Sequence, residues 1–332
     1  MANNTIDIRN LSEFYSSPRS LRDVLRGVPA QKMCALDNIS FNVKQGEIFG
    51  LVGENGAGKT TLLKILSTLL TPASGHVSIA GFDVVTDASK VRRIIGFVSS
   101  NERSFYWRLT GRQNLRFFAR LYDIPGQDME DWIDELLGSL GLLEVGDRRF
   151  DAYSTGMRQR LAFARALLGK PKVIYMDEPT KGLDPSSANA LIRMLQERII
   201  PVWQPTVIIT SHQLAELEKL CDRIAILSRG KLLRCGTMSE LHSSVSLRSR
   251  HHITVSDFTD AAREAVLRIA PWVRLQASDR NLWSMELDDR SGELSQVLAA
   301  ILSHGGVIVN CAEQVVSLED IFLQVTSTEA AA

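Results

Sequence analysis

The sequence predicts an α/β protein with a mixed sheet, followed by a small α+β domain. Three observations favour this fold class. Apolar strand-like runs alternate with helical patterns throughout residues 1–242. The run at 173–177 is apolar almost to its end, as in strands covered by helices on both faces. Strand pairs near the two ends of this region, such as the pair turning at Arg229-Gly230, add antiparallel edges.

The first part of the chain alternates short strands with turns. The patterns predict strands at 5–11, 39–43 and 48–52, with the turn at 44–47 joining the last two as a hairpin. Segment 16–31 has apolar residues at helical spacing, which indicates a short amphipathic helix in an inserted loop. Further elements are expected as a helix at 58–70 and strands at 76–79 and 94–98.

The middle and the end of the chain divide into two regions. Residues 111–168 are helical in pattern with breaks at Pro125-Gly126 and Gly146, so we place a helical subdomain at about 101–168. The serine-rich stretch 243–252 is the expected linker. Domains are therefore expected at 1–242 and 243–332, the second a small α+β domain of ferredoxin-like type. Elements expected after residue 168 are strands at 173–177, 206–210, 223–227, 231–234, 253–255, 272–275, 282–287 and 306–310, and helices at 186–200, 214–220, 259–269, 292–304 and 317–325.

Composition excludes several classes of protein. Lysine plus arginine equals aspartate plus glutamate at 38 each, which argues against nucleic-acid binding through bulk charge. The four cysteines form no CxxC pair, so neither a zinc site nor a disulfide framework is indicated. No signal peptide is visible, and no run approaches the ~18 apolar residues of a membrane helix. We expect a cytoplasmic protein.

A glycine-rich loop predicts ATP binding with Mg²⁺. Residues 53–61, GENGAGKTT, fit the pattern GxxxxGK[ST] between a predicted strand and a predicted helix. The glycines let backbone N–H groups surround phosphates, and the helix N-terminus adds partial positive charge. Lys59 is expected to reach the β- and γ-phosphates, and the Thr60 hydroxyl to bind Mg²⁺. The nucleotide-binding residues of this loop are Gly53, Asn55, Gly56, Gly58, Lys59, Thr60 and Thr61.

Two carboxylates end the buried strand at 173–177. Asp177 is placed beside the phosphate loop, where it can hold Mg²⁺ through water. Glu178 follows directly and can polarise the attacking water as a general base. The alternative is that the two acids only cap the turn before Pro179, and the presence of the phosphate loop disfavours it.

Residues 153–160, YSTGMRQR, resemble the signature motif of ABC-transporter ATPases, which is normally LSGGQ or LSGGM. Tyr153 and Thr155 depart from it, whereas Ser154 and Gly156 keep their places. The resemblance covers about residues 5–240. It implies that two copies assemble head to tail, with Ser154 and Gly156 of one copy capping the γ-phosphate bound by the other. An ordinary helix cap by Ser154 is the alternative.

Other parts of that family are recognisable. Residues 182–185, GLDP, resemble the D-loop that touches the opposing subunit. His212 resembles the switch histidine that contacts the γ-phosphate and orients the water. Tyr15 lies where the family stacks an aromatic ring on adenine, with the neighbouring Phe14 as the alternative. Asn101 takes the place of the Q-loop glutamine, and we expect that its shorter amide still senses the nucleotide, through a bridging water.

The resemblance also implies membrane partners. Segment 104–108, SFYWR, lies where the family receives a coupling helix, although core packing of these rings is the alternative. Segment 317–323, SLEDIFL, resembles the tail of drug-resistance exporter ATPases. The implied function is ATP hydrolysis that powers a separate ABC-2-type permease, in a dimer on the inner face of the cell membrane. A regulatory or sensor ATPase remains open. A ribosome- or DNA-acting ATPase is disfavoured, because the chain has one ATPase unit and no long coiled coil.

Overall fold

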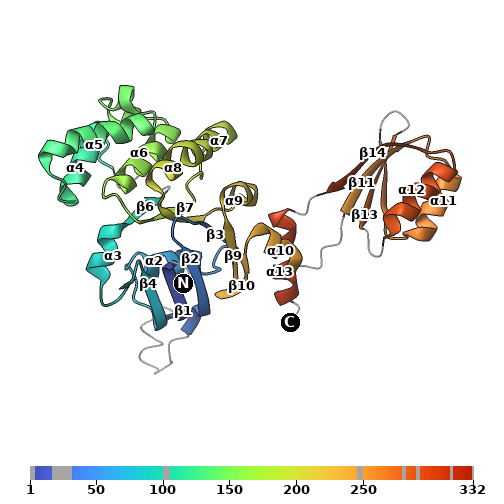
Figure 1. Ribbon diagram of the computed structural model, residues 1–332, viewed down its shortest axis with the longest axis horizontal. Coiled ribbons are helices and arrows are strands. Elements are labelled where there is room, and N and C mark those ends of the chain that lie inside the picture. Colours follow the sequence, from blue (N-terminus) through green and yellow to red (C-terminus); the bar gives the residue numbers. More distant parts are fainter. Residues whose placement is uncertain are drawn as a thin grey trace, which may run out of the picture. The chain divides into compact units, whose positions relative to one another are not determined.

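The computed structural model describes residues 4–16, 32–99, 105–244, 250–278, 282–288, 292–314 and 317–330. The chain divides into two compact units, Met1–Met238 and Ser239–Ala332 (Figure 1). The helix expected at 16–31 and the Q-loop position Asn101 lie outside the described residues, apart from Ser16 at the end of the first strand. None of the described helices is both long and apolar enough to cross a membrane.

A six-stranded sheet forms the centre of the first unit, as the apolar strand patterns predict. Its order is β10-β9-β3-β8-β7-β6. Five strands run parallel, and β10 pairs antiparallel with β9 at the edge. Every residue of β3 and β8 is buried. The bounds are β3 Ile48–Gly53, β6 Ile95–Ser99, β7 Val173–Asp177, β8 Thr206–Thr210, β9 Arg223–Ser228 and β10 Lys231–Gly236.

A second, antiparallel sheet corrects the predicted hairpin. It contains β2 Lys32–Lys44, β1 Asn4–Ser16, β4 Ser74–Ile79 and β5 Phe82–Asp83, in that order. The strands on either side of the turn at 45–47 therefore belong to different sheets, and the hairpin prediction is wrong. The reason is burial: β3 is covered along its whole length and lies between β8 and β9, whereas β2 is partly exposed and pairs with β1. Glu47 fixes the crossing, since its carboxylate accepts from the Lys44 amide at 2.6 Å and pairs with Arg223 at 3.1 Å.

Helices of the first unit cover the central sheet and gather into a helical region. The breaks predicted within 111–168 are confirmed, because α4, α5 and α6 are separate helices there (Figure 1). Helix α2 ends earlier than expected, at Leu66, and Thr68 just beyond it has a left-handed φ of 59°. The bounds are α2 Lys59–Leu66, α3 Ala88–Ile94, α4 Gly111–Leu121, α5 Gly126–Ser139, α6 Thr155–Leu167, α7 Pro185–Met194, a π-helical turn Leu195–Ile199, α8 Ile200–Trp203 and α9 Leu214–Leu220.

The second unit has the ferredoxin-like order of elements that the sequence suggests. Its strands and helices follow as β11 Arg250–Ser256, α11 Asp260–Ile269, β12 Arg274–Ser278, β13 Leu282–Asp288, α12 Glu293–Ser303 and β14 Val307–Gln314. They form an antiparallel sheet in the order β12-β13-β11-β14. One apolar cluster packs the helices against this sheet. Helices α10 Met238–Ser244 and α13 Leu318–Ala330 flank the βαββαβ segment in the sequence.

Tyr153 links the segment before α6 to the start of α4. Its side chain is buried, and its hydroxyl donates to the Val145 carbonyl at 2.8 Å. Gly111 opens α4 directly against it, and a Cβ at this position would lie 2.2 Å from the tyrosine oxygen. Tyrosine therefore fits at position 153 because position 111 has no side chain.

This contact predicts a non-additive pair of substitutions. Tyr153→Phe loses the bond to Val145 and should cost about 1 kcal/mol of unfolding free energy. Gly111→Ala should cost about 2–3 kcal/mol, because the new methyl group displaces the tyrosine oxygen. The double variant should lose less than the sum, since phenylalanine removes the closest atom. Urea unfolding of all four proteins measures this, and strictly additive losses would contradict the contact.

Candidate active site

A cavity of about 260 Å³ opens at the edge where the central strands end. The loop from β3 to α2 forms one wall, and the others are formed by the start of β2 and by residues at or just beyond the ends of β1, β7 and β8. The structure thus brings most predicted site residues together. Those that line the cavity are Tyr15, Asn55, Gly56, Gly58, Lys59, Thr60, Thr61, Asp177, Glu178 and His212. Gly53 is not among them; a Cβ there would lie 2.5 Å from the Leu227 carbonyl, so it allows close packing beneath the loop.

The phosphate loop needs glycine for two reasons at position 58. Gly58 has a φ of 103°, a conformation that residues with a side chain rarely adopt. A Cβ there would also lie 2.5 Å from the Ala35 carbonyl of β2. Because Gly58 is the N-cap of α2, the free N–H groups of that helix face the cavity. This arrangement can bind a phosphate group.

Lys59 is held inside the loop by backbone oxygens. Its ammonium donates to the Gly53 carbonyl at 2.5 Å and to the Glu54 carbonyl at 2.9 Å. Only 9% of the residue is exposed. Burial lowers the pKa of this ammonium, while the negative charges of Glu178 and Asp177 oppose the shift. The cation is therefore fixed at the centre of the loop, close to both carboxylates.

Thr210 positions the two acidic residues. Its hydroxyl donates to the Asp177 carboxylate at 2.8 Å and accepts from the Glu178 amide at 3.1 Å. Thr210 is the last residue of β8 and is fully buried. Sequence reasoning missed this residue, because no spacing in the sequence pairs the end of β8 with the end of β7. One side chain thus directs the Asp177 carboxylate and holds the backbone of Glu178.

Glu178 adopts a strained backbone and carries charged partners. Its φ of 49° is left-handed, which is uncommon for a residue with a side chain. Its carboxylate pairs with Lys181 at 2.5 Å and contacts Nε2 of His212. Burial alone would raise its pKa, but the Lys181 hydrogen bond and the charges of His212 and Lys59 outweigh burial and lower the pKa. Glu178 is therefore anionic, the form that a general base requires.

The residues present fit a magnesium ion that is bound together with phosphates. Thr60 and Asp177 both line the cavity and supply oxygen ligands. Within the described ranges, no group of three or more His, Cys, Asp or Glu residues could hold a metal by itself. Mg²⁺ typically takes one or two protein oxygens and completes its shell with water and phosphate oxygens, so this donor set suits it.

Tyr15 and Phe14 occupy different positions on β1. The Tyr15 ring lines the cavity, and its hydroxyl lies 3.4 Å from the Thr61 hydroxyl. Phe14 is 44% exposed and is not among the lining residues. Of the two rings, Tyr15 has the geometry to stack on a base held beside the phosphate loop.

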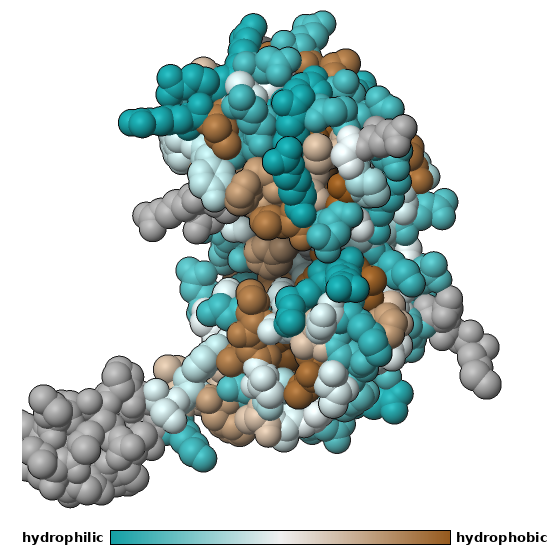
Figure 2. Space-filling model, turned by 90° about the vertical axis from the view of Figure 1, so that its left-hand side faces the viewer, coloured by the Kyte–Doolittle hydropathy of each residue, from teal (hydrophilic) through white to brown (hydrophobic). Residues whose placement is uncertain are grey.

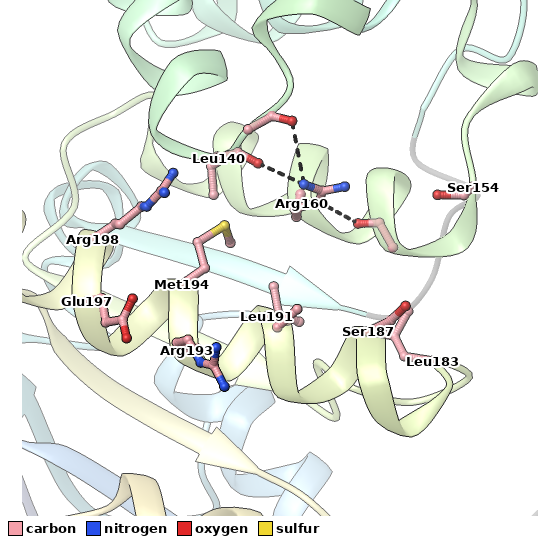
Figure 3. A pocket seen from close by; sticks show the side chains of 13 residues that line it. Leu140, Ser154, Arg160, Leu183, Ser187, Leu191, Arg193, Met194, Glu197 and Arg198 are labelled. Carbon is pink, nitrogen blue, oxygen red and sulfur yellow. Dashed lines mark hydrogen bonds between the residues drawn. The ribbon is translucent and has the colours of Figure 1, made fainter.

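Ser154 and Gly156 line a different cavity of the same chain (Figure 3). Ser154 caps α6 by accepting from the Met157 amide at 3.3 Å. Asp184 similarly caps α7 through the amides of Ser186 and Ser187, both at 3.0 Å. The structure therefore does not bring the signature-like residues to the phosphate loop of their own chain.

The aromatic run at 105–107 divides between core and surface. Phe105 is buried and stacks on Phe150 with ring centroids 4.8 Å apart. Tyr106 and Trp107 are 50% and 45% exposed. Core packing is thus correct for Phe105 only. Figure 2 shows exposed apolar side chains across the middle of the face that carries α3 and α4. Other exposed apolar residues of α4 and its end are Phe117, Leu121 and Tyr122.

Comparison with known proteins agrees with this geometry. The family model "ABC transporter" matches residues 36–181. The chain is 32% identical to the linearmycin resistance ATP-binding protein LnrL of Bacillus subtilis, covering 89% of this chain and 94% of that protein. It is 34% identical to the daunorubicin resistance ATP-binding protein DrrA3 of Streptomyces coeruleorubidus, covering 89% and 92%. The solved dimeric ATP-binding cassette MJ0796, bound to ADP and Pi, has a TM-score of 0.60 at 25% identity, covering 70% of this chain and 98% of that one.

The position of Thr210 leads to a kinetic prediction. Thr210→Val should lower kcat of ATP hydrolysis by about 10- to 100-fold, because Asp177 and Glu178 lose the hydroxyl that directs them. ATP affinity should change little, since the phosphate loop is untouched. Thr210→Ser keeps the hydroxyl and is the matched control. Steady-state hydrolysis with a separate nucleotide-binding titration measures both, and equal kcat values in all three proteins would refute the role of Thr210.

Proposed function

The chain belongs to the ABC transporter family of ATP-binding proteins, and we propose that it is the ATP-hydrolysing subunit that powers an ABC-2-type export permease. One observation carries the proposal. The phosphate loop and the signature-like residues of one chain line separate cavities. One copy therefore supplies only half of a closed site, and ATP binding can drive two copies together.

We propose a head-to-tail dimer that holds two ATP molecules. Lys59 and the α2 N-terminus of one copy bind the phosphates, and Ser154 with Gly156 of the other copy cap the γ-phosphate. Ser154 and the free N–H groups of the first turn of α6 form a helix end that can bind an anion. The phosphate loop of the same chain does not lie at this helix end. The similarity to a solved dimeric cassette supports this arrangement.

The roles in hydrolysis follow from the charges around the phosphate loop. Glu178 is anionic and is proposed to accept a proton from the attacking water, with His212 beside it to orient that water and contact the γ-phosphate. Lys59 neutralises phosphate oxygens. Thr60 and Asp177 would hold Mg²⁺, which supplies further positive charge for the leaving phosphate. Thr210 keeps the Asp177 carboxylate and the backbone of Glu178 in place throughout.

The proposed export function is supported by the relatives and by the exposed rings that precede α4. LnrL and DrrA3 carry names of resistance to linearmycin and daunorubicin, and their alignments are long enough to extend into the second unit. We propose that a separate integral membrane permease docks on the exposed rings of Tyr106 and Trp107. The chain would then act on the inner face of the cell membrane without a nucleic-acid partner.

We also propose functional boundaries for the chain. Residues 1–242 would form the nucleotide-binding domain, including a helical subdomain at about 101–168, and residues 243–332 an accessory domain. The compact units divide at nearly the same place, after Met238. Nucleotide sensing by Asn101 stays a prediction, because this position lies outside the described residues.

Glu178→Gln should trap the dimer. Without its general base the protein binds ATP but does not release the closed state by hydrolysis. With ATP and Mg²⁺ the molar mass from light scattering should rise from 36.9 kDa to about twice that value. Adding Lys59→Ala should abolish this shift, because the phosphates lose their cation. A Glu178→Gln protein that hydrolyses ATP at the full rate would exclude Glu178 as the base.

Tyr106→Ala with Trp107→Ala should uncouple the chain from its permease. The isolated protein should hydrolyse ATP at a rate within about twofold of wild type, because both rings lie outside the nucleotide cavity. Co-purification with the co-expressed permease should fall about tenfold, as expected when central aromatic contacts are truncated. Val202→Ala, which changes a 65% exposed apolar residue on α8, is the control. Unchanged co-purification would rule out this docking surface.

A further inference from the structure

A second cavity, of about 350 Å³, lies between α6 and α7 and differs in character from the nucleotide cavity. We call it the α6–α7 pocket. Its walls are the end of α5 at 140–141, the first turns of α6, and α7 with the π-helical turn that follows (Figure 3). Its volume falls within the range of about 300–1,000 Å³ that is usual for small-molecule sites. The whole pocket belongs to the first compact unit.

The floor of the pocket is apolar. Leu191 and Met194 point from α7 toward α6 (Figure 3). Leu140, Leu183 and Ala190 extend this surface. The floor suits an aliphatic or aromatic body rather than a bare inorganic ion.

The polar lining is mainly cationic. Three arginines, Arg160, Arg193 and Arg198, face one carboxylate, Glu197. In the described part of the chain, the guanidinium groups of Arg193 and Arg198 make no ion pair or hydrogen bond. Figure 3 shows Arg198 extending toward the Leu140 side of the pocket. A cationic rim over an apolar floor favours an anion that carries an apolar group.

Arg160 is the most constrained of these cations. Among the described residues, it donates only to neutral carbonyl oxygens, those of Gly156 and Leu140 at 3.3 Å and that of Gly141 at 3.5 Å (Figure 3). Burial lowers the pKa of its guanidinium, and no carboxylate in the part of the chain that the structure describes offsets that shift. A half-buried cation without an anionic partner gains from one, because charge-assisted hydrogen bonds are about twice as strong as neutral ones.

We propose that the α6–α7 pocket binds a small amphipathic organic anion, one phosphate or carboxylate group on a short apolar chain. The anionic group lies between Arg198 and Arg160, and the chain covers Leu191 and Met194. Such a molecule has two sources, the headgroup region of an anionic lipid or a soluble metabolite, and both present the same chemistry to these residues.

Occupancy of the pocket would act on ATP hydrolysis. Ser154 and Gly156 form one end of the α6–α7 pocket, and these residues are proposed to cap the nucleotide of the second copy. A bound anion would occupy space beside that helix end and repel the approaching γ-phosphate. This step rests on the proposed dimer, whereas binding itself does not.

Calorimetry with octyl phosphate as the probe tests the site. The nucleotide-free wild-type protein should bind one molecule, more tightly than it binds inorganic phosphate, because the chain adds apolar contact. Arg198→Gln should weaken binding at least tenfold, which is the loss expected for one charge-assisted contact. Arg120→Gln, which changes an exposed arginine of α4 outside the pocket, is the charge-matched control. Arg198 is chosen over Arg160, whose three carbonyl contacts also support the fold.

Three results separate the alternatives. Binding that Arg198→Gln leaves unchanged, or that is lost only with Lys59→Ala, would place the anion elsewhere and overturn the site. Flotation of the protein with phosphatidylglycerol vesicles that depends on Arg198 identifies the lipid as the source, and Arg198-dependent calorimetric binding without flotation identifies a soluble anion.

Octyl phosphate should also slow ATP hydrolysis by wild type but not by Arg198→Gln. Hydrolysis that is unaffected despite intact binding would overturn the regulatory step alone, and calorimetry remains valid even if Glu178→Gln fails to dimerise.

Discussion

The parallel register of β3, β8 and β7 determines where the chemistry of this protein takes place. Leu51 of β3 and Asp177 of β7 are both in register with Thr210 of β8. The strands therefore end near one level, and the phosphate loop, the two carboxylates and His212 leave them at the same edge. Because β3 and β8 are buried along their whole length, a shift of one residue would disrupt core packing as well as the site.

The helical region supplies the other kind of site residue, and its position depends on side chains rather than on strand register. Tyr153 ties the segment before α6 to the Val145 carbonyl, and Arg160 ties the first turn of α6 to the end of α5. The helix end that carries Ser154 is thereby held by the helical region, while the far end of α6 packs closely against Gly96 of β6. The two half-sites therefore depend on different contacts, strand register for one and side-chain hydrogen bonds for the other.

Much of the site could be predicted because its residues follow local patterns at strand ends. Asp177, Glu178 and His212 follow apolar runs closely, Lys59 lies in the glycine-rich loop after another such run, and the sheet brings all four together. The hairpin prediction failed because a turn signal does not say which sheet the next strand joins, and the burial of β3 decided that. Thr210 escaped prediction because its role depends on a contact with Asp177 of the neighbouring strand, which no spacing in the sequence records. Lys181 lies three residues after Glu178, and the ion pair between them depends on the turn that follows β7.

The arginines beside α6 connect these two anchoring schemes. The guanidinium of Arg160 donates both to the Gly156 carbonyl and to the carbonyls of residues 140–141 at the end of α5. A movement of the first turn of α6 would therefore also displace residues 140–141. Carbonyl oxygens compensate only part of the cost of burying that charge, and the remaining part favours an anion nearby. The γ-phosphate of the ATP bound by a second copy and an amphipathic anion would both approach this end of α6. Their competition would make the state of the α6–α7 pocket a direct control on dimer closure.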